Sequence, residues 1–265
     1  MQGLILLDWD ETLVDKQIQI NDARLNEILR MKIDEGWLIG LNSDTPLRRL
    51  HNWWQSLDLN GPIVAERGAV VWWPGSPPHV VSKSIGLFTG IRHEITDALI
   101  GSEDCALFYG DSTEFIRSVK HIGISDKILV SFDAYRLCSV GMFVHTIFNG
   151  EPTRDKTALA RVEQLVSDIV PQHPLVSPVL VEREVSYIWL NCTDVDKTKG
   201  VVALLKDSVA LSRIIMIGNS MNDYINLPGV HHFAVGNAEQ DFKDRSLRVA
   251  SCDYAKGCVE LLGAL

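Results

Sequence analysis

The chain has 265 residues, enough for two compact units, and its 25 basic and 34 acidic residues give a formal net charge of −9. This balance argues against general nucleic-acid binding, which needs a basic face, and no uncharged apolar stretch reaches the ~18 residues of a membrane-spanning helix. Five scattered cysteines without Cys-x-x-Cys spacing, and a first apolar run too short for a secretory signal, predict reduced thiols and a cytoplasmic protein.

A short apolar run followed at once by two acids opens the chain. Residues 3–7 read as a buried strand, and Asp8 and Asp10 come directly after it. Ligands of open α/β sheets bind beyond the carboxyl ends of the strands, and two buried acids this close favour a cation or a proton between them. The alternative is ordinary turn or helix-capping chemistry.

Strand and helix patterns alternate as far as residue 73. The predicted elements are a helix between Asn21, as its cap, and Gly36, a strand at 38–41, a helix over 47–57, and strands at 63–65 and 69–73. In the second helix, the spacing places Trp54 on the buried stripe and leaves Trp53 off it. The Pro- and Gly-rich segment 74–78 then ends the pattern.

The region between about residues 82 and 190 has an alternation of its own. The predicted elements are a helix on Leu87, Ile91, Ile95 and Leu99, strands at 128–132 and 138–148, the second ending at the Asn149-Gly150 turn, a helix from Thr153 or Asp155 to Ile169, and strands at 179–182 and 185–190. This mixture predicts a second α/β unit inserted into the first.

A second acidic loop follows a later strand. Residues 212–217 read as a buried strand, and Gly218–Asp223 follows it with Asn and Asp side chains. Because carboxyl ends of parallel strands meet at one edge of a sheet, this loop and the Asp8 segment are expected to converge there.

Together these segments resemble the haloacid dehalogenase (HAD) superfamily of phosphohydrolases. The matching features are Asp8, Asp10 and Thr12 for the first motif, Ser43 after a strand for the second, Lys199-Gly200 for the third, the loop 218–223 for the fourth, and the smaller segments 65–69 and 235–238. The resemblance covers nearly the whole chain. It implies an α/β fold, with a HAD-like Rossmannoid core of mainly parallel sheet at 1–82 and 191–265 and an inserted α/β cap domain at 83–190. The cap is loosely similar to those of archaeal phosphoglycolate phosphatases and sucrose-phosphate phosphatases.

The resemblance also implies roles for individual residues. Asp8 is expected to attack phosphorus and form an aspartyl-phosphate, and Asp10 to act as the general acid and base. Ser43 is expected to bind a phosphoryl oxygen and Lys199 to compensate negative charge, with Lys197 as the alternative lysine; outside this pattern, either would read as a solvated cation. The expected phosphate- or substrate-binding residues are Thr12, Ser43, Asp44, Lys199 and Asn222. The expected ligands of Mg²⁺ are Asp8, Asp10 through its main-chain carbonyl, Asn219 and Asp223.

Two positions depart from the family pattern. Asn219 stands where the family usually has Asp, which predicts weaker Mg²⁺ binding. Glu11 stands where Gly is frequent, either adding negative field or facing solvent as a turn residue. Trp9, between the two acids, is expected to point into packing.

The sequence therefore predicts a Mg²⁺-dependent phosphatase acting on a small phosphorylated metabolite, either a sugar phosphate or a phosphorylated carboxylic acid such as phosphoglycolate. Arg117, Lys120, His121 and Tyr187 of the insertion are candidates for specificity, the alternative being surface or packing roles. A phosphomutase of the same fold and a non-catalytic regulatory protein on a degenerate site remain alternatives. Neither nucleic acid nor a membrane is expected as a partner, and homo-oligomerisation stays open.

Overall fold

The chain divides into two compact units. The computed structural model describes residues 2–110, 127–148, 151–172, 180–184, 187–206 and 213–265. The discontinuous unit consists of Met1–Val81 and Val195–Leu265, and the inserted unit of Ser82–Asp194. The sequence predicts the two boundaries after residues 82 and 190, and the structure divides the chain after Val81 and Asp194.

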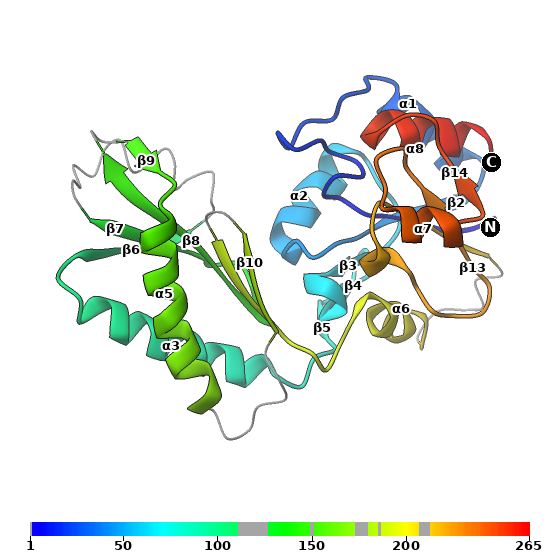
Figure 1. The fold of residues 1–265 in the computed structure, drawn as a ribbon. Helices are drawn as coiled ribbons and strands as arrows, with labels where there is room; N and C mark the ends of the chain where they lie inside the picture. Colours follow the sequence, from blue (N-terminus) through cyan, green and yellow to red (C-terminus); the bar gives the residue numbers. More distant parts are fainter. Residues whose placement is uncertain (1, 111–126, 149–150, 173–179, 185–186, 207–212) are drawn as a thin grey trace. The chain divides into compact units, whose positions relative to one another are not determined.

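The discontinuous unit is built on a mainly parallel sheet. In the described residues, eight strands follow the order β14-β13-β12-β1-β2-β3-β4-β5 (Figure 1). Their bounds are β1 (Gly3–Leu7), β2 (Trp37–Asn42), β3 (Ile63–Ala65), β4 (Val70–Trp72), β5 (His79–Val80), β12 (Ile214–Gly218), β13 (Val230–Ala234) and β14 (Arg248–Val249). Neighbours pair in parallel from β14 to β3, and β4 pairs antiparallel with both β3 and β5. The predicted α/β class is confirmed.

Strand β1 lies between β12 and β2, which explains its uninterrupted apolar run. All of its residues are buried, since a strand with neighbours at both edges and side chains on both faces has no solvent-facing side. Its last residue, Leu7, stands opposite Leu41 of β2 and Ile217 of β12. The carboxyl ends of these three strands therefore meet at one edge of the sheet.

Helices and short 3-10 turns accompany this sheet. They are α1 (Leu25–Asp34), α2 (Leu47–Ser56), α6 (Lys197–Lys206), α7 (Gln240–Arg245) and α8 (Tyr254–Gly263), with the turns η1 (Glu66–Gly68) and η3 (Met221–Asp223). Helices α1 and α8, blue and red in Figure 1, pack against each other, and α6 packs against β3 and β4. Val201 and Leu204 of α6 share a core cluster with Leu4 and Leu6 of β1.

The start of the first helix differs from the expectation. Helix α1 begins at Leu25, and Asn21 does not cap it. Instead, the Asp22 carboxylate accepts hydrogen bonds from the main-chain N–H and the guanidinium of Arg24. These bonds stabilise a turn in front of the helix, so the capping residue type alone placed the start too early, whereas the apolar pattern begins at Leu25 as the helix does.

The inserted unit is a second α/β layer. Its described strands are β6 (Cys105–Gly110), β7 (Ile128–Asp133), β8 (Ser139–Phe148), β9 (Glu151–Thr153), β10 (Leu180–Glu184) and β11 (Tyr187–Asn191). They follow the order β10-β11-β8-β7-β6, with β9 paired to β8. Its described helices are α3 (Ile85–Ile100) and α5 (Lys156–Ile169), and α5 is followed by the 3-10 turn η2 (Val170–Gln172).

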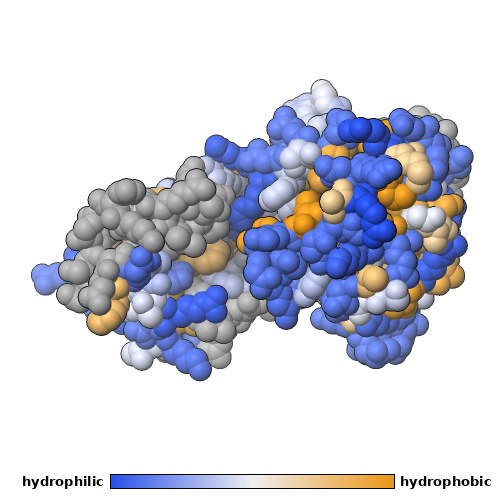
Figure 2. Space-filling view, turned by 90° about the horizontal axis from the view of Figure 1, so that it is seen from above, coloured by the Kyte–Doolittle hydropathy of each residue, from blue (hydrophilic) through white to orange (hydrophobic). Residues whose placement is uncertain are grey.

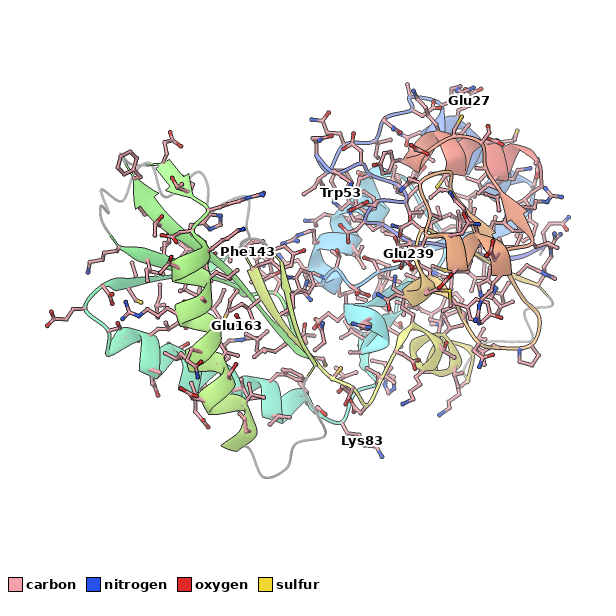
Figure 3. All side chains as sticks on the ribbon, viewed as in Figure 1. Glu27, Trp53, Lys83, Phe143, Glu163 and Glu239 are labelled. Carbon is pink, nitrogen blue, oxygen red and sulfur yellow. The ribbon has the colours of Figure 1, made fainter. Side chains whose placement is uncertain are left out.

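Most predicted elements of this unit are present with small shifts. The α3 stripe uses Phe88 in place of Leu87, and Asp155 rather than Thr153 caps α5 by accepting from the N–H groups of Thr157 and Ala158. The Asn149-Gly150 turn lies outside the described residues, as do Arg117, Lys120 and His121. Tyr187 is half-buried on β11, where its ring packs against Phe143 and Trp189 (Figure 3 labels Phe143).

A carboxylate joins the two ends of the inserted unit. Asp194, its last residue, accepts hydrogen bonds from Ser82 Oγ at 3.0 Å and from the main-chain N–H of Lys83 at 2.8 Å (Figure 3 labels Lys83). The first and last residues of the inserted unit are therefore hydrogen-bonded neighbours.

The visible surface of the discontinuous unit is mostly hydrophilic, with small hydrophobic patches among polar side chains (Figure 2). In the part of the chain that the structure describes, no helix combines the length and the apolar character that crossing a bilayer requires. Trp9 is buried, as expected, with its ring centroid 4.5 Å from that of Trp53 on α2 (Figure 3 labels Trp53). Trp53 thus packs on the strand-end loop, although its helical phase placed it off the buried stripe.

Candidate active site

Three loops and the start of α6 converge beyond the carboxyl ends of β1, β2 and β12. Asp8 follows β1 and continues its hydrogen bonding to β12, since the N–H of Asp8 donates to the carbonyl of Ile217 at 2.9 Å. Ser43 follows β2, and its N–H donates to Val64 O at 3.0 Å. The loop from Gly218 to Asp223 follows β12. The predicted convergence of the two acidic segments is present.

Lys197 is the lysine at the centre of this site. Its Nζ lies 2.8 Å from Asp8 Oδ1 and 2.6 Å from Asp223 Oδ1, with Asp44 Oδ1 farther away at 3.9 Å. The Lys197 side chain is only 4% exposed. One ammonium therefore sits between two buried carboxylates and cannot neutralise both.

Lys199 does not take that place, so the sequence-based choice of lysine is corrected. Lys199 is exposed, and its main-chain N–H donates to Asp196 Oδ1 at 2.7 Å. Helix α6 begins at Lys197, and a residue two positions farther on is rotated by about 200° around the helix axis. The buried stripe of α6 consists of Lys197, Gly200, Val201 and Leu204. The buried face of the helix therefore carries Lys197, and Lys199 lies on the opposite side.

Two glycines allow α6 to approach close enough for this contact. A Cβ on Gly200 would lie 2.6 Å from Gly68 Cα and 2.8 Å from Val64 Cγ1. Gly68 has φ +95°, and a Cβ there would lie 2.0 Å from the carbonyl oxygen of Asp196. The backbone of η1 thus packs directly against the start of the helix that carries Lys197.

Gly200→Ala is expected to lower the free energy of unfolding by about 1–3 kcal/mol, because the added methyl meets backbone that has to shift. Helix propensity alone predicts the opposite sign, a gain of about 0.5–1 kcal/mol. Urea denaturation measures the difference, with Val202→Ala on the exposed side of the same helix as the control. A more stable Gly200→Ala protein would show that the close approach is not maintained.

The electrostatics of this group follow from burial and like charges. Burial raises the pKa of Asp8 well above its usual value, and the nearby charges of Asp223 and Asp10 raise it further, against the effect of Lys197. Burial alone would lower the pKa of Lys197, but Asp223 and Asp8 more than reverse this and hold the ammonium protonated. The site therefore carries an excess of negative charge, which favours an additional cation.

Asp10 lies at the accessible side of the site. Its Oδ2 accepts hydrogen bonds from Thr45 Oγ1 at 2.9 Å and Ser43 Oγ at 3.3 Å, and Ser43 Oγ accepts from the N–H of Thr45. Protein around the carboxylate raises the pKa of Asp10, although the residue itself is solvent-exposed. This exposure lets Asp10 exchange a proton with water or a ligand.

The acidic loop is fixed by Asp223. Its Oδ2 accepts from the N–H groups of Asn219 at 2.9 Å and Ser220 at 3.0 Å, while Oδ1 contacts Lys197. Gly218 is required for this turn, because a Cβ there would lie 2.4 Å from Asp223 Oδ2. Across the site, Thr12 Oγ1 donates to Asn219 Oδ1 at 3.2 Å.

Further hydrogen bonds stabilise the loops that follow β1 and β12. Asn237 Nδ2 donates to the carbonyl of Glu11 at 2.8 Å, and the N–H of Tyr254 donates to Asn237 Oδ1. Glu239, labelled in Figure 3, accepts from the N–H of Met221 at 2.9 Å. Glu11 adopts φ 54°, which explains why Gly is frequent at this position in the family that the sequence resembles.

Arg67 is a neighbour of the site that sequence reasoning did not identify. Its Nη2 donates to Asn222 Oδ1 at 3.3 Å, and its main-chain N–H donates to the carbonyl of Ser43 at 3.3 Å. Asn222, expected to bind phosphate, is exposed and accepts this hydrogen bond from Arg67. A hint was present in the segment 65–69, where Arg replaces the Asn of the family pattern.

The structure thus brings together Asp8, Asp10, Thr12, Ser43, Asp44, Asn219 and Asp223, with Lys197 in place of Lys199. In the described ranges, no group of three or more His, Cys, Asp or Glu side chains forms a ready-made metal cage. The oxygen-rich, negatively charged setting suits Mg²⁺, which is usually bound by one or two carboxylates and several waters rather than by an all-protein cage.

One family model covers nearly the whole chain. The model of haloacid dehalogenase-like hydrolases matches residues 5–262. No curated protein matches the chain significantly in sequence. A haloacid dehalogenase-like hydrolase from Bacteroides thetaiotaomicron has a similar structure, with a TM-score of 0.70 at 16% identity over 100% of this chain and 99% of that one.

Two further solved structures share the fold. One is a trehalose-6-phosphate phosphatase related protein, with a TM-score of 0.58 and 16% identity over 99% of this chain and 96% of that one. The other is described as showing conservation of a trigonal-bipyramidal intermediate in a phosphoryl-transfer superfamily, with a TM-score of 0.60 and 14% identity over 100% and 98% of the two chains.

Proposed function

Because the chain belongs to the haloacid dehalogenase-like hydrolases, we propose that it is a Mg²⁺-dependent phosphatase of a small phosphorylated metabolite. The observation that carries the proposal is the group of Asp8, Lys197 and Asp223, buried at the end of β1, with Asp10 beside it on the solvent side. This arrangement offers a carboxylate nucleophile, a fixed positive charge and a proton carrier within one site.

In the proposed reaction, Asp8 attacks phosphorus while Asp10, in its protonated form, donates a proton to the leaving oxygen. Asp10 then takes a proton from the water that hydrolyses the aspartyl-phosphate. Ser43 and Thr45 orient Asp10 through the hydrogen bonds to its Oδ2. Lys197 offsets negative charge on Asp8 and the phosphoryl group, in a reaction whose catalysis is mainly positioning and charge stabilisation.

Mg²⁺ would be held by Asp8, the main-chain carbonyl of Asp10 and the side-chain oxygen of Asn219. When bound, the ion supplies charge neutralisation for the phosphoryl oxygens. Both carboxylate oxygens of Asp223 already accept hydrogen bonds, Oδ1 from Lys197 and Oδ2 from the N–H groups of the loop. We therefore assign Asp223 to positioning of the loop and of Lys197 rather than to direct coordination of the ion. The excess negative charge around Asp8 is the property of this site that fits the ion.

Asn219→Asp is expected to tighten Mg²⁺ binding by about tenfold, because ligand charge is a main determinant of affinity at such sites. The hydroxyl of Thr12 can donate to a carboxylate as it does to the amide. Calorimetric titration with Mg²⁺ alone measures the change, and Asn226→Asp, at an exposed position after η3, controls for general electrostatics. Equal tightening in both variants would place Asn219 outside the coordination sphere.

The inserted unit would act as the cap that selects the substrate, either a sugar phosphate or a phosphorylated carboxylic acid. The proposed function is tested by phosphate release from a panel of small phosphate esters, with Mg²⁺ and with EDTA. Mg²⁺-dependent release from a subset supports it. Isomerised product without free phosphate would indicate a phosphomutase, and no reaction by the folded protein would indicate a regulatory role.

A further inference from the structure

The chain segment that leaves the acidic loop is held by two side chains. Ile225, two residues after Asp223, donates its N–H to Nε2 of His232 at 3.0 Å. The N–H of the next residue, Asn226, donates to Thr198 Oγ1 at 3.1 Å. This segment lies between η3 and β13, outside the ladder of the sheet, so its N–H groups depend on side chains for their acceptors. The loop is therefore anchored just beyond Asp223.

The ring of His232 is fixed in orientation by its aromatic neighbours. His232 lies on β13 and is only 6% exposed. Its ring stacks on Tyr224, with the centroids 4.4 Å apart and the planes inclined by 21°, and Phe242 of α7 packs edge-on with its centroid at 6.1 Å. A ring that is packed on two sides keeps Nε2 directed at the N–H of Ile225.

The hydrogen bond defines the protonation state of His232. A main-chain N–H can only donate, so Nε2 is the acceptor, the imidazole is neutral and its proton is on Nδ1. Burial lowers the pKa of His232, His231 lowers it further, and the carboxylate of Asp223 acts in the opposite direction. The net shift favours the neutral ring, which is the form that can hold Ile225.

Asp223 is the residue through which this anchor acts on the site. Its Oδ1 lies 2.6 Å from Lys197 Nζ, and its Oδ2 accepts from two N–H groups of the loop. These contacts require the chain at Asp223 to stay in place, and His232 holds that chain two residues farther on. Without the bond, the N–H of the buried Ile225 loses its acceptor, so the segment is expected to shift toward water and to move Asp223 with it.

We propose that His232 is a positioning residue of the active site, whose Nε2 fixes the end of the acidic loop and thereby holds Asp223 against Lys197. It acts through Ile225 and Asp223 rather than on the substrate. The inference rests on the proposed phosphatase function and extends the machinery of that site to β13.

Three substitutions separate the acceptor from the ring. In His232→Gln, Oε1 is as many bonds from Cβ as Nε2 of histidine, whereas Oδ1 in His232→Asn is one bond closer and falls short of Ile225. His232→Phe keeps a ring against Tyr224 but has no acceptor. In the Asn and Phe variants, kcat for p-nitrophenyl phosphate with Mg²⁺ is expected to fall about tenfold or more, as when an outer hydrogen-bond partner of a metal site is removed. His232→Gln is expected to recover most of that loss.

Amide hydrogen exchange, followed by NMR, measures the loop independently of turnover. The N–H groups of Asn219 and Ser220 donate to Asp223. They are expected to exchange about tenfold or more faster in His232→Asn than in the unmodified protein, because the loop opens more often, and His232→Gln is expected to stay within about threefold. A further measurement needs no substitution: the ring ¹⁵N shifts of His232 at pH 7 are expected to show a protonated Nδ1 and an unprotonated Nε2.

The inference is overturned if His232 carries its proton on Nε2, or if His232→Gln loses as much activity as His232→Asn. Unchanged kcat in the Asn and Phe variants would overturn it as well, even with faster exchange of the loop. If the unmodified protein releases no phosphate, the phosphatase function is refuted instead, and the exchange rates still decide whether His232 fixes the loop.

Discussion

Asp8→Asn is expected to abolish phosphate release while the protein remains folded. An amide oxygen is a poor nucleophile for phosphorus, so the covalent route is lost, and kcat is expected to fall by at least about 10⁴-fold. The substitution keeps the size of the side chain, and its amide oxygen can still accept from Lys197, which lies 2.8 Å from Asp8 Oδ1 in the native site.

Stability is expected to change little in this variant, since the removed charge is one of two carboxylates that share a single ammonium. Phosphate release and urea denaturation measure the two effects. Asp34→Asn, the same chemical change at an exposed position of α1, is the control. Comparable turnover by Asp8→Asn and the unmodified protein would refute Asp8 as the nucleophile.

Lys197→Met is expected to cause the largest combined loss of activity and stability. It leaves Asp8 and Asp223 buried and facing each other without their shared cation, which typically costs about 3–5 kcal/mol when one partner of a buried pair is removed. Loss of the charge that balances the phosphoryl group also lowers kcat. Steady-state kinetics and urea denaturation measure both losses.

Lys199→Met is the matched control, because it makes the same change two residues farther along α6. Lys199 is exposed, so the free energy of unfolding is expected to stay within about 0.5 kcal/mol, with kcat nearly unchanged. If Lys199→Met lost more activity than Lys197→Met, the assignment of the central lysine would be wrong.

The sequence by itself determined the fold class, the family and which strand-end segments carry the candidate site residues. A buried strand followed by acids is a local pattern, and the apolar runs 3–7 and 212–217 fix where Asp8, Asp10 and the loop 218–223 leave the sheet. Since the carboxyl ends of parallel strands lie at one edge of a sheet, the sequence also predicts that these segments meet.

Tertiary structure decided which side chains meet. The choice between Lys197 and Lys199 depends on the residue at which α6 begins, because two positions on a helix turn a side chain from the core to solvent. The contacts of Thr12 with Asn219 and of Arg67 with Asn222 join residues far apart in the chain. They depend on strand register and on the close packing of Gly68 and Gly200, and a local pattern contains neither.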